Sequence, residues 1–282
     1  VRSRGLGDVY KRQHLPRHNS IYAAHSTEIE RAAQDFGDHE GVTVGKITRW
    51  ISNFSDQHGQ VATKILRNVR YYSSSNIRSM TYQLVKIVQQ GFASIPWDKV
   101  VFVPIGEPYA GGAIIARVLR ETNMIRKENI RHMVELERVT QAQVGALVFI
   151  DDFSGTGNTL KDWWPLVEPI VLPRNAPFAI ALLVLNGMAR EIVESLTDKV
   201  FCIDELDEND NVLSPKSTKF NPPEKDIILY YCNKTGCTAD YVRGYGNCGL
   251  LVAFKYGCPN NSLPILWHKS SAWEPLFKRR GL

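Results

Sequence analysis

The chain has 282 residues, of which 44% are hydrophobic, enough for a substantial core in one large domain or in one domain with an appended piece. No stretch contains the ~18 consecutive apolar residues of a membrane span, and no signal-peptide segment begins the chain, so we expect a cytoplasmic protein without a membrane partner. The net charge is +5, but residues 1–13 contribute most of it, and the remainder gives no reason to expect direct nucleic-acid binding.

Residues 1–13, "VRSRGLGDVYKRQ", have no apolar periodicity, and "DVYKRQ" resembles one reading frame of a translated transposon-end sequencing tag. We therefore expect these residues to be a non-native tail. Residues 14–96 have a helical pattern. The stretch "STEIERAAQDF" predicts a short helix, and apolar residues at three- and four-residue steps from Val61 to Val88 predict two or three amphipathic helices. This segment is the expected N-terminal helical region.

Residues 97–204 alternate between short apolar strands and helices. Predicted strands are "VVFVPI", "HMVELE", "GALVFI", "FAIALLVLNG" and "VFCID", and predicted helices are "YAGGAIIARVLRETN", "TLKDWWPLVEPIV" and "MAREIVESLT". Strands that are apolar throughout and alternate with helices are typical of a parallel sheet covered on both faces. The sequence therefore predicts an α/β core with a doubly wound, mainly parallel sheet.

Residues 205–282 differ in composition from this core. Their acidic and then Pro-rich beginning, "DELDENDNVLSPKSTKFNPPEKD", predicts an exposed excursion. The apolar remainder is expected to pack back on the core as a C-terminal extension, because an isolated segment this apolar would aggregate. The chain has five cysteines, an odd number that argues against a disulfide framework. Four of them lie close together but lack the paired C-x2-C spacing of strong zinc sites, so buried thiols and a structural zinc both remain open: Cys232, Cys237, Cys248 and Cys258.

The candidate site is the stretch 147–160, "LVFIDDFSGTGNTL". Ligands of doubly wound sheets bind beyond the carboxyl ends of the strands, and a strand at 146–150 would deliver Asp151 and Asp152 to that edge. A loop of small donors then precedes a helix, whose N-terminal N–H groups and partial positive charge suit a phosphate. The candidate phosphate-binding residues are Ser154, Gly155, Thr156, Gly157, Asn158 and Thr159.

Two carboxylates beside a phosphate need another partner, either a ribose diol or Mg²⁺, and a 5-phosphorylated ribose supplies what both halves of the site require. Competing motifs fail. The loop lacks the Gly-Lys-Ser/Thr of a Walker motif, neither aspartate has a second acid two residues later, and the GxGxxG from Gly244 to Gly249 precedes a strand-like segment instead of a helix. A capped strand-to-helix turn without a ligand is the remaining alternative.

This stretch resembles the phosphoribosyl-pyrophosphate motif of type I phosphoribosyltransferases, with Thr156, Gly157 and Thr159 at the Thr-Gly-x-Thr positions. The family's pyrophosphate loop has a match in "VPIGEPYAGGAII", although an ordinary glycine turn is an alternative there. That loop often contains a strained peptide, which Glu107-Pro108 could supply. The resemblance implies that the following residues face pyrophosphate: Ile105, Gly106, Glu107, Pro108 and Tyr109.

Further stretches, "RWISNF", "LRNVRYYS", "GYGNCGLLVAF" and "PNNSLPILW", resemble the PRTase-CE group, a phosphoribosyltransferase domain with a C-terminal extension linked to bacterial anti-phage systems. The likeness covers residues 46–277. It implies that Asp151 and Asp152 are the catalytic residues, which bind the ribose hydroxyls directly or through Mg²⁺ as cofactor. It also implies a ligand, phosphoribosyl pyrophosphate or a related nucleotide, a defence-system partner protein and, by analogy with the fold, a homodimer.

Two features depart from the family pattern. The segment that would cover the site, "ERVTQAQVG", is short, with Arg138, Gln141 and Gln143 as its polar groups. No hood for a base is identifiable, and core packing is favoured over base stacking for the candidate aromatics Tyr71, Tyr72, Tyr109 and Trp163. Two functions therefore stay open: a phosphoribosyltransferase-type enzyme that acts as a defence effector, and a non-catalytic nucleotide sensor that signals through its C-terminal extension.

Overall fold

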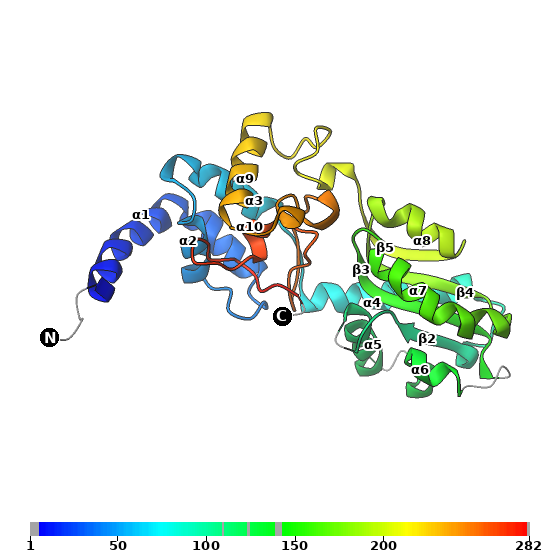
Figure 1. The fold of residues 1–282 in the computed structure, drawn as a ribbon. Coiled ribbons are helices and arrows are strands. Elements are labelled where there is room, and N and C mark those ends of the chain that lie inside the picture. The colour runs from blue at the N-terminus through cyan, green and yellow to red at the C-terminus, as the bar shows by residue number, and fades with distance from the viewer. Residues whose placement is uncertain (1–5, 109, 123–124, 139–142, 281–282) are drawn as a thin grey trace. The chain divides into compact units, whose positions relative to one another are not determined.

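The computed structural model describes residues 6–108, 110–122, 125–138 and 143–280, and Tyr109 and Gln141 lie outside them (Figure 1). The chain forms two compact units. The sheet unit comprises residues 75–208, and the terminal unit combines the chain up to Ser74 with residues 209–280. These boundaries differ from the three consecutive segments expected from the sequence, because the N-terminal helices and the C-terminal extension fold together. No helix among the described residues is long and apolar enough to cross a membrane.

The sheet unit contains four parallel strands in the order β2-β3-β4-β5. They are β2 (Val100–Pro104), β3 (Ala146–Ser154), β4 (Phe178–Asn186) and β5 (Val200–Leu206). Every residue of β2 and β3 is buried, and so is all of β4 except its first residue. Such burial is typical of a parallel sheet with helices on both faces, and it explains why these strands are apolar runs without alternation.

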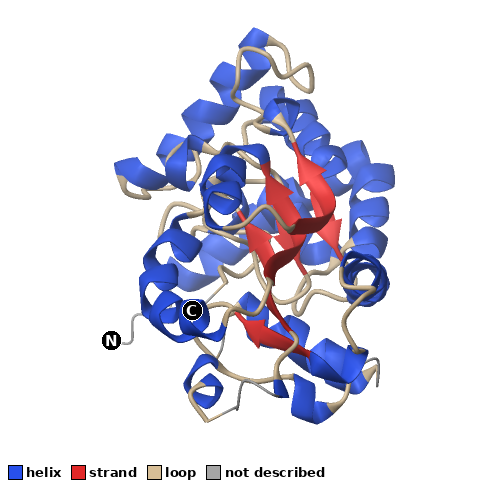
Figure 2. Ribbon diagram, turned by 90° about the vertical axis from the view of Figure 1, so that its right-hand side faces the viewer, coloured by secondary structure: helices blue, strands red, loops and turns tan. Residues whose placement is uncertain are grey.

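Helices lie on both faces of this sheet (Figures 1 and 2). On one face, α7 (Asn158–Val171) and α8 (Arg190–Leu196) share a core with Leu147 and Phe149 of β3. Residues of α4 (Ser74–Gly91) and α5 (Gly111–Glu121) are not part of that core. Phe92, just after α4, contacts Phe201 of β5, and α5 packs against β2 and β3. The fold is thus the doubly wound α/β fold expected from the sequence.

One predicted strand is wrong. The stretch "HMVELE" contains a short helix, α6 (Met133–Leu136), in which Glu135 accepts a hydrogen bond from the backbone N–H of His132 at 2.7 Å. This local capping bond favours helix over strand. In place of the predicted strand, the segment just before α6 makes one parallel β-bridge to β2, between Ile130 and Phe102. Short 3-10 helices complete the sheet unit: Trp97–Lys99, Lys127–Asn129, Leu172–Arg174 and Gly187–Ala189.

The terminal unit is built from both ends of the chain. Its helices are α1 (Leu6–Asp35), α2 (Val44–Ile51), α3 (Gly59–Asn68), α9 (Pro222–Lys234) and α10 (Pro264–Trp267), and its 3-10 helices are Asp56–His58, Glu208–Asp210, Ala239–Tyr241 and Tyr245–Asn247. Strand β1 (Arg70–Tyr72) pairs in parallel with β6 (Val252–Phe254). The short helix expected at 26–36 is the second half of α1, which is irregular at His25.

A single aromatic core holds the two ends of the chain together. Phe54 contacts Trp50, Trp273 and Tyr231 edge-on or tilted, with ring centroids 4.4–5.4 Å apart. The indole Nε1 of Trp50 donates to the carbonyl of Ile265 at 2.7 Å, across 215 residues of sequence. Neither end could bury these rings alone, which is why the extension forms its core with the N-terminal helices.

Candidate functional site at the carboxyl edge of the sheet

The candidate carboxylates lie within β3, because the strand is longer than predicted. The predicted strand ended at Ile150, whereas β3 continues to Ser154 and stays in register with β4, Asp151 opposite Leu182 and Ser154 opposite Leu185. Asp151 is 8% exposed and Asp152 is fully buried. The backbone N–H of Asp152 donates to Oδ1 of Asp151 at 2.9 Å. The two acids are therefore held on the strand itself and not on a mobile loop.

The alternation of the strand gives the two aspartates different surroundings. Successive side chains of a strand point to opposite faces of the sheet. The side chain of Asp151 points to the same face of the sheet as that of Phe149. The ring centroids of Phe149 and of Trp163 in α7 are 5.6 Å apart. Asp152 follows Ile150 and so belongs to the opposite face, where α5 packs. The site is thus bordered by one carboxylate on each face of β3, an arrangement that was not expected because the predicted strand ended at Ile150, before both acids.

The loop after β3 delivers the N-terminus of α7. Gly157 precedes the helix with φ +81, a left-handed conformation that favours glycine, and it has no side chain to cap the first turn. Inside the loop, the backbone N–H of Asn158 lies 3.4 Å from Oγ1 of Thr156, and Thr159 is exposed. The positive end of the helix dipole makes this end of α7 suitable for an anion.

The second loop follows β2. Ile105 continues the sheet, since its N–H donates to the carbonyl of Ile150 at 2.9 Å, and Gly106 then turns the chain with φ +81. Glu107 and Pro108 are exposed. The peptide between them is trans, so it is not the source of strain that the resemblance suggested; the described residues contain no cis peptide bond.

The helix after this loop approaches the strands closely. A Cβ atom on Gly112 of α5 would lie 2.5 Å from the carbonyl oxygen of Ile150 and 2.6 Å from the nitrogen of Ile105. Only glycine fits there. The N-cap residue of α5, Ala110, makes no side-chain capping bond. The first turn of α5 is therefore held against the carboxyl ends of β2 and β3, without a side-chain cap from Ala110.

The site coincides with the switch point of the sheet. The chain leaves β2 for α5 on one face and leaves the neighbouring strand β3 for α7 on the other. In open α/β sheets, ligands bind where adjacent connections diverge in this way. The edge brings together two buried carboxylates and two helix N-termini. It can bind a ligand that carries phosphate groups and hydroxyl groups.

Asn186 is a residue of this edge that the sequence reasoning missed. It ends β4, is 3% exposed, and its Nδ2 donates to the carbonyl of Gly155 at 2.9 Å, which fixes the loop before α7. A single amide at the end of the apolar run "FAIALLVLN" was the available signal.

Other candidates lie elsewhere. Arg138 is exposed, and so is Gln143 at the far end of the segment that would cover the site. Trp163 packs in the core against Phe149. The favoured core packing also holds for Tyr72, which stacks on Phe254 in the terminal unit.

Tyr71 is likewise in the terminal unit. Its hydroxyl donates to Asp38, and burial together with this bond raises the pKa of Tyr71.

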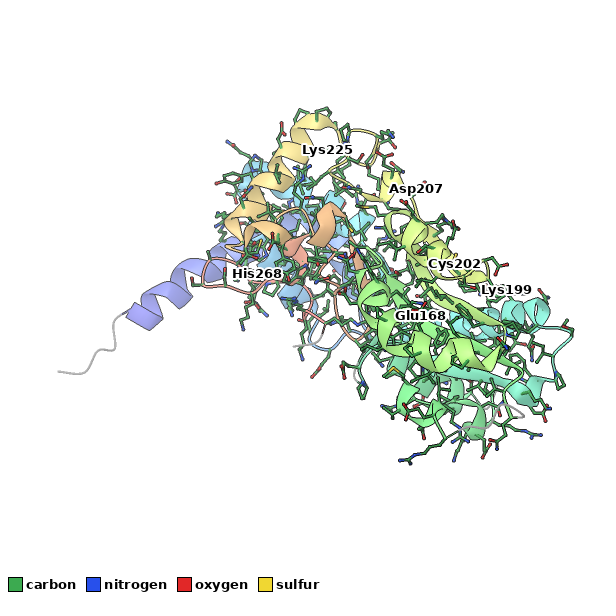
Figure 3. All side chains as sticks on the ribbon, turned by 45° about the vertical axis from the view of Figure 1, so that its right-hand side comes forward. Glu168, Lys199, Cys202, Asp207, Lys225 and His268 are labelled. Atoms are coloured by element: carbon green, nitrogen blue, oxygen red, sulfur yellow. The ribbon has the colours of Figure 1, made fainter. Side chains whose placement is uncertain are left out.

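The cysteines do not form a metal centre among the described residues, where no group of three or more His, Cys, Asp or Glu side chains could hold an ion. All five are free thiols, and Cys202 lies on β5 in the sheet unit (Figure 3). Burial raises the pKa of Cys232 and of Cys258, whose Sγ lies 3.1 Å from the carbonyl oxygen of Val252. Buried, protonated thiols, the alternative to a structural zinc site, therefore account for Cys232 and Cys258.

Comparison with known proteins decides the family. The PRTase-CE family model matches residues 47–279, most of the chain. The chain belongs to the PRTase-CE family. No curated protein matches it.

Solved structures include more distant resemblances to this PRTase-CE chain. A xanthine-guanine-hypoxanthine phosphoribosyltransferase from Helicobacter pylori is 15% identical, with a TM-score of 0.34 over 49% of this chain and 83% of that one. An orotate phosphoribosyltransferase from Aeropyrum pernix is 16% identical, with a TM-score of 0.32 over 46% and 71%. At these TM-scores we build no argument on them.

Proposed function

We propose that the sheet unit binds phosphoribosyl pyrophosphate, or a related 5-phosphoribosyl nucleotide, with Mg²⁺ at the carboxyl edge of β2 and β3. The observation that carries the proposal is that the N-terminal turns of α5 and α7 both lie at the edge of the sheet that carries Asp151 and Asp152. A ligand with phosphate at two positions and a diol between them matches two anion-binding ends separated by carboxylates. Membership of the PRTase-CE family supports the same ligand class.

Each part of the ligand would contact its own set of residues. The 5-phosphate would lie at the N-terminus of α7, on the loop 154–159. The pyrophosphate would lie at the first turn of α5, beside residues 105–109. The ribose hydroxyls would face Asp151 and Asp152, directly or through Mg²⁺.

The donor set is compatible with Mg²⁺, which is commonly held by one or two carboxylates together with ligand phosphates, and the ion would neutralise charge on the pyrophosphate. Asp151 and Asp152 are the residues that would hold it.

We further propose that the site transfers or cleaves at the anomeric carbon. The bond from C1 of the ribose to the pyrophosphate oxygen breaks, and the electron pair leaves with pyrophosphate. A nucleophile, a base or water, forms the new bond to C1 and loses its proton to solvent. The ribosyl centre gains positive charge in the transition state, so fixed carboxylates nearby stabilise it. The positive N-terminal end of the α5 dipole would stabilise the negative charge of the leaving group. Such an enzyme would deplete nucleotide precursors as a defence effector.

The non-catalytic sensor is a second candidate. It is favoured by the shortness of the segment 137–145, because a reacting oxocarbenium-like centre must be shielded from water by a covering loop. Release of pyrophosphate separates the two candidates. An enzyme releases pyrophosphate from phosphoribosyl pyrophosphate in the presence of an acceptor, whereas a sensor binds the ligand and returns it unchanged.

Two substitutions test the assignment of the site. Asp152→Asn removes a fully buried charge without changing the side chain's shape, so we expect weaker binding of phosphoribosyl pyrophosphate in a protein at least as stable as the parent. Thr156→Val should weaken binding of ribose 5-phosphate more than binding of ribose. Calorimetry measures both. Unchanged affinity in Asp152→Asn contradicts the ribose assignment, and equal losses in Thr156→Val contradict the phosphate assignment.

A further inference from the structure

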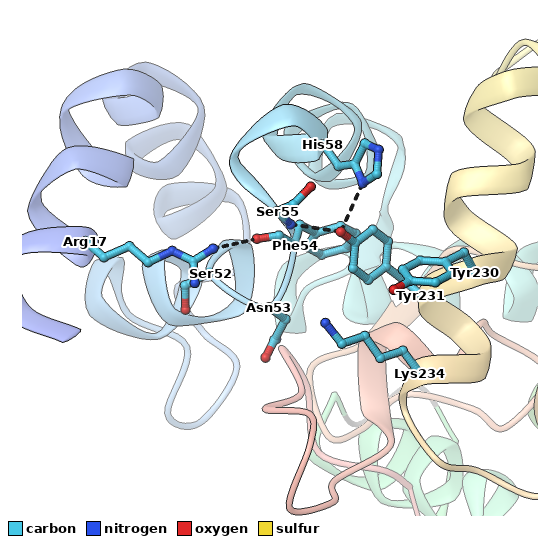
Figure 4. Close-up of a pocket in the computed structure, with 9 residues that line it drawn as sticks. All are labelled: Arg17, Ser52, Asn53, Phe54, Ser55, His58, Tyr230, Tyr231 and Lys234. Atoms are coloured by element: carbon cyan, nitrogen blue, oxygen red, sulfur yellow. Dashed lines mark hydrogen bonds between the residues drawn. The ribbon is translucent and has the colours of Figure 1, made fainter. Parts of the chain in front are cut away.

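A hollow lies within the terminal unit, at a place for which the family resemblance assigns no role. It has a volume of about 430 Å³, within the range of small-molecule sites. Arg17 enters it from α1, a loop after α2 forms its floor, and α9 forms the opposite wall (Figure 4). The described residues that line it are Arg17, Ser52, Asn53, Phe54, Ser55, His58, Tyr230, Tyr231 and Lys234.

The lining carries excess positive charge. Arg17, Lys234 and His58 are basic, and none of the described lining residues is Asp or Glu. Nη2 of Arg17 donates to the carbonyl of Phe54 at 3.1 Å and lies 3.4 Å from Asp56, whose side chain is 84% exposed, so that ion pair is well screened. Lys234 makes no ion pair within the described part of the chain, and its Nζ lies 5.6 Å from the centroid of the Tyr231 ring. An anion entering the hollow would meet two cations, and its one nearby carboxylate competitor, that of Asp56, is exposed and does not line the hollow.

An aromatic surface stands next to this charge. Tyr230 is 59% exposed, unusually open for a large ring, and it is four residues before Lys234 on α9. Residues at this spacing lie on the same side of a helix. The exposed ring and the ammonium group therefore face the hollow from one wall (Figure 4).

The floor of the hollow is fixed by Tyr231, which is buried. Its hydroxyl oxygen accepts the backbone N–H of Ser55 at 2.8 Å and lies 3.0 Å from Nδ1 of His58. The tautomer of His58 decides which of the two atoms donates in this second bond. The hydrogen bonds hold His58 and the Ser55 backbone in place before any ligand arrives.

We propose that this hollow binds a nucleotide, with its phosphate at Arg17 and Lys234 and its base against Tyr230. Guanidinium and ammonium groups are the usual partners of phosphate. Any of the nucleotide bases can stack on an exposed aromatic ring, because every base has a π-face. A free phosphate would leave Tyr230 without a role, and a nucleoside would leave the two cations without one. The inference does not depend on the proposed function of the sheet unit.

The test is calorimetric titration of the full chain with AMP, GMP and UMP in turn. Adenosine and inorganic phosphate serve as probes of the two halves of the ligand. A background that combines Asp152→Asn with Thr156→Val weakens binding at the sheet unit, and nucleotide binding that persists in this background and is lost in Lys234→Glu belongs to the hollow. We expect one nucleotide per chain, bound at least about tenfold more tightly than adenosine or phosphate, since stacking of one base contributes about 1–3 kcal/mol.

Matched variants locate the binding. Lys234→Glu should weaken nucleotide binding at least about tenfold, because it replaces a phosphate-binding charge with a repelling one. Lys269→Glu makes the same charge change at an exposed lysine of the same unit that does not line the hollow, and it should change little. Tyr230→Ala should weaken nucleotide binding and leave phosphate binding as it was.

Three results would overturn the proposal: no nucleotide binds to the folded protein, phosphate binds as tightly as the nucleotides, or Lys234→Glu and Lys269→Glu weaken binding equally. Circular dichroism and thermal unfolding establish that each variant is folded. Loss of phosphoribosyl pyrophosphate binding at the sheet unit would leave these outcomes unaffected, because that site is measured separately through Asp152→Asn.

Discussion

Gly112→Ala is the substitution that most sharply tests how the sheet edge is built. The added Cβ would lie 2.5 Å from the carbonyl oxygen of Ile150, and 2.6 and 2.8 Å from the nitrogen and oxygen of Ile105. All three contacts are to backbone atoms of neighbouring strands, so no side chain can swing aside. Alanine in place of glycine inside a helix otherwise stabilises by about 0.5–1 kcal/mol. Overpacking costs about 1–3 kcal/mol, and three backbone contacts this short place the substitution at the upper end of that range, so we expect net destabilisation of about 2–2.5 kcal/mol.

Gly45→Ala is the matched control. Gly45 is the second residue of α2, as Gly112 is the second residue of α5, and its nearest neighbour would be Nη1 of Arg49 at 3.6 Å, an ordinary contact. The control should be neutral or stabilising by up to about 1 kcal/mol. The difference between the two variants isolates the close approach of α5 to the strands.

Hydrogen exchange of the β2 and β3 amides measures the effect in the sheet unit alone, which a global unfolding curve of a chain with two units does not. Binding of phosphoribosyl pyrophosphate should also weaken in Gly112→Ala, because the first turn of α5 is displaced from the site. A Gly112→Ala protein as stable as the parent, with unchanged affinity, would refute the claim that this contact shapes the site.

Three further expectations concern other parts of the chain. Asn186→Ala should cost about 1–3 kcal/mol in the sheet unit, since the buried carbonyl of Gly155 loses its amide donor, and it should weaken ligand binding; amide exchange in β3 and calorimetry check this. Trp50→Ala should cost about 3–5 kcal/mol and lower the exchange protection of α9 while sparing β3, because one core joins the ends of the chain; intact protection in α9 would contradict that. Burial raises the pKa of Cys232 and Cys258, so their contribution to stability is present below the unfolded pKa of about 8.5 and is lost as pH rises from there; urea denaturation between neutral and alkaline pH should show the decline, and Cys258→Ala should reduce it.

The sequence predicted the parts of the fold that depend on local pattern. Apolar runs located the four strands of the sheet, and alternation with helices predicted the doubly wound arrangement. The motif 151–159 predicted a helix that begins directly after a glycine-rich loop, which is where α7 begins. The wrong prediction of a strand at "HMVELE" also has a local cause, because the capping bond from His132 to Glu135 favours a helix there.

Long-range contacts explain what could not be predicted. The end of β3 is set by its pairing with β4 as far as Ser154, and a single strand gives no sign of how far its neighbour extends. The division into two units depends on contacts such as that between Trp50 and Ile265, at opposite ends of the chain. Asn186 belongs to the site only because the sheet order places β4 beside β3.

The most direct test of the proposed site is calorimetric titration of the full chain with phosphoribosyl pyrophosphate, with and without Mg²⁺. We predict binding at one site per chain that is stronger with Mg²⁺, that weakens in Asp152→Asn, and that persists in Lys234→Glu. Absence of binding by the folded protein, or binding that Lys234→Glu abolishes and Asp152→Asn leaves unchanged, would contradict a phosphoribosyl site at the carboxyl edge of β2 and β3.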